Sequence, residues 1–188
     1  MTARPPALPS LGIPLLFDYL YWLRDRVLDT AEGLGEAFAS TPIVGTRDLR
    51  ATLAHELDIE LGWRGRLRGE APEAWGPEAE VKPEHVPTLE AVRVRWATEE
   101  AATRGWLAGL SPADLAAPVT ANGLEGYPLE IYLLHVVEHG VMELTDAAAI
   151  LAAMGHSTGD LGVLDALDDL APLPRPGAPS AMPTPRSS

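Results

Sequence analysis

The clearest structural signal in the chain is the stretch LEIYLLHVVEHGVMELTDAAAILAAMG, which runs from Leu129 to Gly155. It follows Pro128, contains no further proline, and repeats apolar residues at intervals of three and four. This spacing predicts one long amphipathic helix that starts about Pro128 and stops at Gly155, a residue type that favours the end of a helix. Such a helix has one broad apolar face, on which a polar side chain needs a partner.

That apolar face contains one imidazole and one carboxylate. His139 and Glu143 stand four residues apart, so they differ by only about 40° around the helix axis. A buried carboxylate without a partner is costly or takes up a proton. Two arrangements satisfy the pair: shared coordination of a metal ion, or a hydrogen bond or ion pair within the protein.

Working outward from this helix, the rest of the chain shows three more helical segments separated by stretches rich in proline and glycine. The second segment is expected to begin at Thr46 as its N-cap. A linker at 71–87 contains four prolines and cannot be helical throughout. The predicted helices span about 14–34, 46–69, 88–110 and 128–155. Four helices of this length predict an all-α fold, a four-helix bundle.

The ends of the chain differ from its centre in composition. Residues 1–13 form a proline-rich arm, and the bundle is expected to occupy 14–170, with a short extra helix at about 160–170. The last segment, 171–188, contains six prolines and almost no large apolar residue. This composition cannot form a packed core, so the tail is predicted to be disordered.

Composition excludes several classes of function. The chain has 188 residues, no cysteine and a formal net charge of −13. Without cysteine it has no disulfide, no thiolate metal ligand and no cysteine nucleophile of its own. The negative charge argues against binding to nucleic acid, and no run of about 18 apolar residues could span a membrane. We therefore expect a cytoplasmic protein.

The second helix supplies a further histidine, His55, within TLAHELDIELGW. The stripe of leucines at 49, 53, 57 and 61 lies nearly opposite His55, which shares its side with Ala51, Ile59 and Gly62. The small residues among these neighbours would leave room for a ligand or an ion. A half-buried histidine that hydrogen-bonds to Asp58 or to a backbone group is the simpler interpretation, and both interpretations stay open.

The remaining histidines are weaker candidates. His135 lies one turn before His139, but positions 135, 139 and 143 turn through about 80°, which makes a single three-way site awkward on a straight helix. His135 is therefore expected to support a ligand or to lie at the edge of the core. His85 lies between prolines in the linker, and His156 follows the helix-ending Gly155. Neither is assigned a chemical role.

The order of these motifs resembles the DinB/YfiT-like family. A helix with TLAHELDIELGW comes first, LLHVVEHG follows a long intervening arm, and MGHSTGDLGVLDAL comes after the last helix. The resemblance covers about 15–170. It implies an antiparallel four-helix bundle, commonly a homodimer, with a metal site formed by one histidine of the second helix and two histidines, four apart, of the fourth.

Carried over by position, the resemblance implies His55 and His139 as the first two metal ligands, and the third falls on Glu143. The usual ending resembles HGxxHR, whereas this chain reads HGVMEL, so a glutamate replaces the third histidine and Leu144 replaces the arginine. Two imidazoles and one carboxylate suit zinc, nickel, manganese or iron. Alternatively, the site is degenerate and has lost its metal.

The resemblance also implies a choice of functions. Characterised relatives include metal-dependent thiol S-transferases and mycothiol-dependent maleylpyruvate isomerases. If the transferase chemistry of these relatives applies to this chain, His55, His139 and Glu143 would hold a divalent metal and Asp58 would orient an imidazole. A low-molecular-weight thiol would then be the cosubstrate. The second hypothesis is a non-catalytic, stress-associated dimeric scaffold with a vestigial pocket. A hydrolase that uses metal-activated water comes third.

Overall fold

The computed structural model describes residues 12–170, which form a bundle of four long helices. Its long helices are α1 (Gly12–Ala31), α2 (Leu49–Leu67), α3 (Leu89–Leu107) and α5 (Leu129–Ala153). The shorter elements are η1 (Glu32–Ser40), η2 (Pro72–Ala74), η3 (Pro83–His85), α4 (Pro112–Ala116), η4 (Ala121–Gly123) and α6 (Val163–Leu170). The predicted all-α bundle is confirmed.

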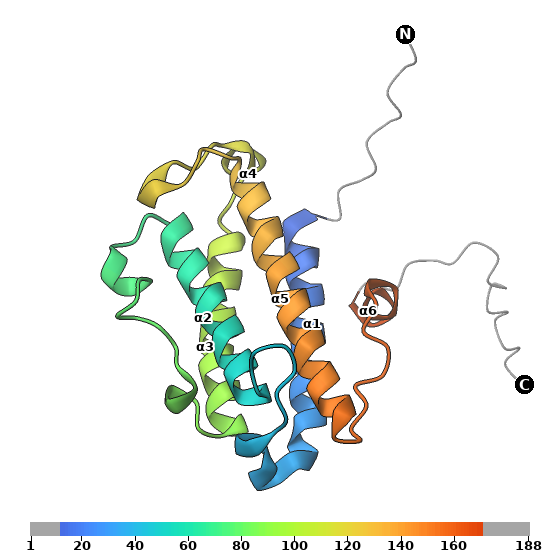
Figure 1. The fold of residues 1–188 in the computed structure, drawn as a ribbon. Helices are drawn as coiled ribbons and strands as arrows, with labels where there is room; N and C mark the ends of the chain where they lie inside the picture. The colour runs from blue at the N-terminus through green and yellow to red at the C-terminus, as the bar shows by residue number, and fades with distance from the viewer. Residues whose placement is uncertain (1–11, 171–188) are drawn as a thin grey trace, which may run out of the picture.

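The helices do not simply alternate in direction. Figure 1 shows that α1 and α5 run one way along the bundle and that α2 and α3 run the other way. The linker between α2 and α3 returns along the length of the bundle, so these two consecutive helices point in the same direction. Helix α5 packs most extensively against α1 and α2.

Two helix boundaries differ from the sequence prediction. Helix α2 begins at Leu49, and its N-cap is Asp48 rather than Thr46, because Asp48 Oδ1 accepts a hydrogen bond from the Ala51 backbone N–H at 2.8 Å. Helix α1 already includes Gly12, two residues before Pro14. A proline in the first turn is tolerated there because those backbone N–H groups have no helical partner.

Near its C-terminal end, the described part of the chain has the short helix that the sequence predicts. The expected short helix near 160–170 is α6, which packs beside α1. There the Trp22 indole donates to Asp169 Oδ2 at 2.9 Å, and the Tyr19 hydroxyl donates to the Leu161 carbonyl at 2.9 Å. The predicted disordered tail at 171–188 and residues 1–11 of the predicted arm lie outside the described residues. Within 12–170, no helix combines the length and the apolar character needed to cross a membrane.

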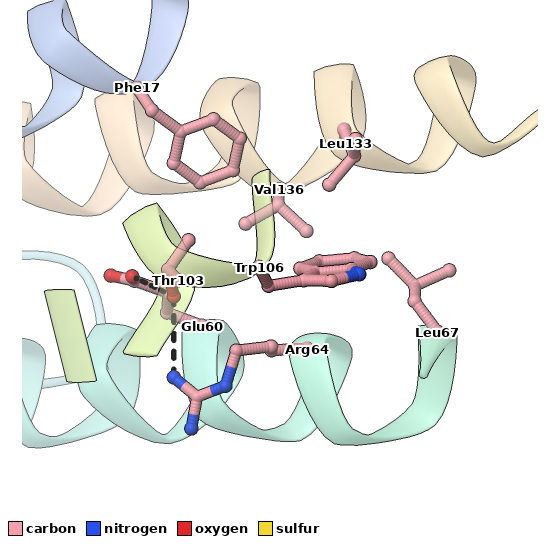
Figure 2. Close-up of a pocket in the computed structure, with 8 residues that line it drawn as sticks. All are labelled: Phe17, Glu60, Arg64, Leu67, Thr103, Trp106, Leu133 and Val136. Atoms are coloured by element: carbon pink, nitrogen blue, oxygen red, sulfur yellow. Dashed lines mark hydrogen bonds between the residues drawn. The ribbon is translucent and has the colours of Figure 1, made fainter. Parts of the chain in front are cut away.

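The four long helices meet around a small pocket of about 10 Å³ (Figure 2), which is room for about one water molecule. One of its walls is the buried carboxylate of Glu60. Its Oε1 accepts hydrogen bonds from the Tyr21 hydroxyl at 2.5 Å and from Thr103 at 3.1 Å, and its Oε2 accepts one from Trp96 at 3.0 Å. Arg64 also donates to Thr103 (Figure 2). This carboxylate is satisfied inside the core, and the pocket is too small for a substrate.

The linker between α2 and α3 contacts α2 through its two short helical turns, η2 and η3. The Val81 backbone N–H donates to Asp58 Oδ1 at 2.7 Å, and the Trp75 indole donates to the Glu70 carbonyl at 2.9 Å. Val81 and Val86 are buried. The linker therefore forms part of the surface beside α2 and is joined to that helix by hydrogen bonding and by buried side chains.

Candidate metal centre

Three side chains predicted to share a site come together where α2 faces α5. His55 belongs to α2, while His139 and Glu143 lie one turn apart on α5. One ligand atom of each lies within 4.8 Å of the other two. Glu143 Oε1 is 3.8 Å from His55 Nε2 and 3.9 Å from His139 Nε2. The two imidazole rings meet edge to face, with their centroids 5.4 Å apart.

This cluster lies at the edge of the core and not inside it. The side chains of His55, His139 and Glu143 are 28%, 23% and 15% exposed. Helix packing therefore holds the three groups in position while one side of the cluster stays open to solvent. A ligand from solution can reach that side, as a metal site that carries out chemistry requires.

His139 is held from behind by a carboxylate that the sequence analysis did not assign. Glu56, on α2, is fully buried, and its Oε2 lies 2.8 Å from His139 Nδ1. When Glu56 is ionised its oxygens can only accept, so Nδ1 carries the hydrogen and the lone pair of His139 is on Nε2, which faces the cluster. A carboxylate behind a histidine fixes its tautomer and strengthens it as a metal ligand.

Burial and hydrogen bonding change the acidity of this pair. Burial raises the pKa of Glu56 to about 7, although its hydrogen bond to His139 opposes the rise. The same hydrogen bond raises the pKa of His139. The second oxygen of Glu56, Oε1, is buried without a hydrogen-bond partner in the part of the chain that the structure describes. The position of Glu56 behind His139 therefore leaves a buried carboxyl oxygen without a partner, which lowers the stability of the fold.

The close packing of this layer depends on Gly140. A Cβ atom at this position would lie 2.5 Å from Glu56 Oε1 and 2.6 Å from Leu20 Cδ1. Neither distance is compatible with ordinary packing. The glycine of the sequence VEHG therefore lets α5 approach α1 and α2 closely enough for His139 to reach Glu56.

A cation also borders the cluster. Arg47, in the loop before α2, has its Nη1 3.4 Å from Oε1 and 3.5 Å from Oε2 of Glu143. Its side chain is 36% exposed. Burial lowers the pKa of His55, and the nearby Arg47 charge lowers it further. Both effects favour the neutral imidazole, which is the form that binds a metal.

The two supporting residues suggested by the sequence occupy other positions. Asp58 does not hydrogen-bond to an imidazole, because its Oδ1 accepts the Val81 N–H of the linker. Its charge still acts on His55, whose pKa it raises slightly against the larger opposing effects. His135 is about half exposed, and its ring contacts Trp63 at 5.2 Å and His139 at 6.5 Å between centroids. His135 therefore lies beside the cluster and belongs to its rim.

Glu56 could have been found from the sequence. On a helical wheel centred on Leu49, Glu56 lies at about −20° and Glu60 at about +20°, so both share a face with the leucine stripe. Two carboxylates on an apolar face are a stronger signal than one, because each needs a partner inside the protein. Arg47 carries no such signal, since it lies in a loop whose path depends on the complete fold.

The residues present fit a divalent metal. Two imidazoles and one carboxylate form a set that suits zinc, nickel, manganese or iron. The buried carboxylate of Glu56 directs Nε2 of one imidazole to the cluster, and the open side leaves room for an exogenous ligand. Glu143 would exchange its long contacts with Arg47 for the metal. The three donor groups, the supporting carboxylate of Glu56 and the solvent exposure of the cluster are all consistent with a metal site.

The fold and the cluster together define a helical-bundle protein with a histidine and carboxylate site between two of its helices. The sequence profile of the DinB superfamily matches residues 19–145, which include His55, His139 and Glu143. The chain belongs to the DinB superfamily, and the resemblance noted in the sequence is confirmed. No curated protein matches the chain significantly.

Proposed function

We propose that this protein binds a divalent metal through His55, His139 and Glu143 and that it is a metal-dependent transferase of a low-molecular-weight thiol. The observation that carries the proposal is the cluster itself, with three ligand atoms within 4.8 Å of one another and one side open to solvent. When bound, a divalent metal lowers the pKa of a thiol or of water at an open position.

The residues of the chain contribute position and polarity to this function. His55 and His139 approach from two helices, and Glu56 keeps the Nδ1 hydrogen of His139 directed away from the cluster. Glu143 adds one negative charge, which offsets part of the charge of the ion. The chain has no cysteine of its own. The sulfur nucleophile must therefore come from a cosubstrate, which agrees with thiol transfer without requiring it.

The decisive experiment measures metal content. Protein purified without a tag is analysed for bound metals beside His139→Ala, Glu143→Ala and, as a matched control, His85→Ala. His85 lies in the linker, where its Nδ1 accepts the Lys82 N–H. We expect nearly one metal per chain in the wild type and in the control, and much less in the other two variants.

A second measurement tests the thiol. Cobalt(II)-loaded protein is titrated with cysteine, and the near-ultraviolet absorption that arises from sulfur-to-cobalt charge transfer is followed. The band should appear for the wild type and be lost in His139→Ala. Protein that takes up metal but shows no band would favour the hydrolase, in which water and not a thiol is activated.

The alternative function is a non-catalytic, stress-associated dimeric scaffold with a degenerate site. One contact favours this alternative. Arg47 forms an ion pair with Glu143, so the carboxylate of Glu143 has a partner even without a metal. Protein that stays metal-free after exposure to zinc, nickel and manganese, yet remains folded, would establish this reading.

A homodimer is proposed under either function, and sedimentation should then give about twice the 20.1 kDa of one chain.

A further inference from the structure

A second site lies beside the cluster, in a cleft between α2 and the linker. This cleft, of about 200 Å³, is lined by Asp58, Ile59, Gly62, Trp63, Arg66 and Trp75. Five of these residues follow one side of α2, and Trp75 comes from the linker. The volume is below the roughly 300–1,000 Å³ of sites for drug-sized ligands, so it suits a small molecule.

The cleft has aromatic walls and a floor without a side chain. Trp63 and Trp75 supply two indole rings, and the Trp63 indole N–H donates to no group among the described residues. Gly62 forms the floor, where a Cβ atom would lie 3.6 Å from the Trp75 carbonyl oxygen and would otherwise meet open space. Flat indole surfaces favour a planar, largely apolar ligand.

Arg66 gives the cleft an unneutralised positive charge. Its Nε and Nη2 donate to the Asn122 carbonyl at 3.2 and 3.1 Å, and its guanidinium lies over the rings of Trp63 and Trp75 at 5.4 and 5.9 Å. Within residues 12–170, every arginine except Arg50 and Arg66 forms an ion pair with a carboxylate. The fixed guanidinium keeps Nη1 available for the oxygens of a carboxylate.

The charges of the cleft also favour one orientation of a bound anion. Asp58 lies at the end near His55, one turn along α2, and Arg66 lies two turns further on, so an anionic group is repelled at the first end and attracted at the second. Contact between the Trp63 and His135 rings, and then between His135 and His139, joins the cleft to the cluster. A ligand bound with its carboxylate at Arg66 would point its other end towards His55.

We propose that this cleft binds a small planar carboxylate, with its ring against the indoles of Trp63 and Trp75 and its carboxylate on Arg66. We further infer that such a molecule is the acceptor substrate, with its reacting end next to the cluster. That role rests on the proposed thiol transfer, whereas binding to the cleft does not. Binding to the cleft is therefore tested in metal-free protein.

The probe is 2-naphthoate, and its neutral analogue 2-naphthylmethanol has nearly the same shape. Each is titrated into chelator-treated full-length protein while the indole N–H signals are followed by NMR. We expect 2-naphthoate to shift the signals of Trp63 and Trp75 and to leave that of Trp22, which is bonded to Asp169, unchanged. The neutral analogue should bind at least about tenfold more weakly, because it lacks the charge that Arg66 recognises.

Two variants test the assignment by different means. Arg66→Gln removes the charge, and Gly62→Leu fills the floor of the cleft, so each should weaken 2-naphthoate binding about tenfold or more. Gly105→Leu is the matched control, because Gly105 is also a helical glycine and has open space around its Cβ position. It should bind like the wild type. Gly62→Leu keeps the test valid if Arg66→Gln disturbs the loop around Asn122.

The proposal is overturned if 2-naphthoate leaves both indole signals in place, if its neutral analogue binds equally well, or if Gly62→Leu binds it as the wild type does. Failure of the proposed function would look different. The protein would then bind no metal in elemental analysis and would still bind 2-naphthoate through Arg66.

Discussion

At the scale of single residues, the cluster is governed by two opposing neighbours. Glu56 holds His139, one of the proposed ligands, with its Nε2 directed to the cluster. Arg47 occupies another, Glu143, and carries a positive charge that repels a metal ion. If the cluster binds a metal, Glu56 should therefore strengthen binding by orienting His139, and Arg47 should weaken it by pairing with Glu143.

The competition gives a prediction for Arg47. Replacement by alanine frees Glu143 and removes a nearby cation, so we expect Arg47→Ala to bind zinc about fivefold more tightly, equivalent to about 1 kcal/mol. Competition with a chromophoric chelator measures this affinity. Arg93→Ala, which removes an ion pair to Asp29 and Glu32 elsewhere, is the control. Unchanged or weaker binding in Arg47→Ala would mean that Arg47 positions Glu143 instead of competing for it.

The sequence predicted part of this site, and the reason is geometric. His139 and Glu143 share a face of one helix, which the spacing alone predicts, and the structure brings His55 next to them. The role of these three as metal ligands stays a proposal. Arg47 could not be predicted, because its position depends on how the loop before α2 packs against α5 beside Glu143. Asp58 was expected to orient an imidazole, but it holds the linker instead.

At the scale of helices, the site depends on how closely α5 approaches its neighbours. Sequence periodicity predicts the length of α5 and its apolar face, but it does not contain the distance between helices. That distance appears only in the structure, where the space beside Gly140 is already filled by Glu56 and Leu20. A glycine that looks unfavourable within a helix is explained by this contact.

Gly140 can be tested against a glycine that has no such contact. Gly140→Ala should lower the free energy of unfolding by about 1–3 kcal/mol, since overpacking outweighs the gain in helix propensity. Gly105→Ala, in α3, meets nothing within 4 Å and should raise that free energy by up to about 1 kcal/mol. Urea unfolding of metal-free protein measures both. A stabilised Gly140→Ala would show that α5 can move away from Glu56 at little cost.

At the scale of the whole molecule, the bundle keeps two carboxyl groups of α2 inside its core. Glu60 is satisfied by three donors, whereas Glu56 leaves one oxygen without a partner in the described part of the chain. The order and approximate bounds of the helices could be predicted from local patterns. The common direction of α2 and α3 could not, because it depends on the linker packing back along α2.

Burial of Glu56 makes stability depend on pH. Its pKa is about 7 in the folded protein, against an ordinary value of 4.5, so the folded state retains a proton that the unfolded state has lost. The raised pKa of His139 acts in the same direction. The free energy of unfolding of metal-free protein should therefore fall as pH rises from 5 to 8, and the part caused by this pair should be about 1–3 kcal/mol.

Two variants isolate this contribution. Glu56→Gln cannot ionise, so the difference between its free energy of unfolding and that of the wild type should change with pH by the stated amount. Glu138→Gln, an exposed position on the same helix as His139, should follow the wild type. A pH-independent difference between wild type and Glu56→Gln would mean that Glu56 keeps its ordinary pKa inside the bundle.

The linker that packs along α2 has a consequence for how proteins of this kind diverge. All three residues of the cluster come from α2 and α5, while one wall of the cleft, Trp75, belongs to the linker. Mutations in the linker can therefore change the shape of the cleft without moving a residue of the cluster. A lineage built on this plan can vary the cleft step by step, and none of its intermediates has to lose the cluster of His55, His139 and Glu143 on the way.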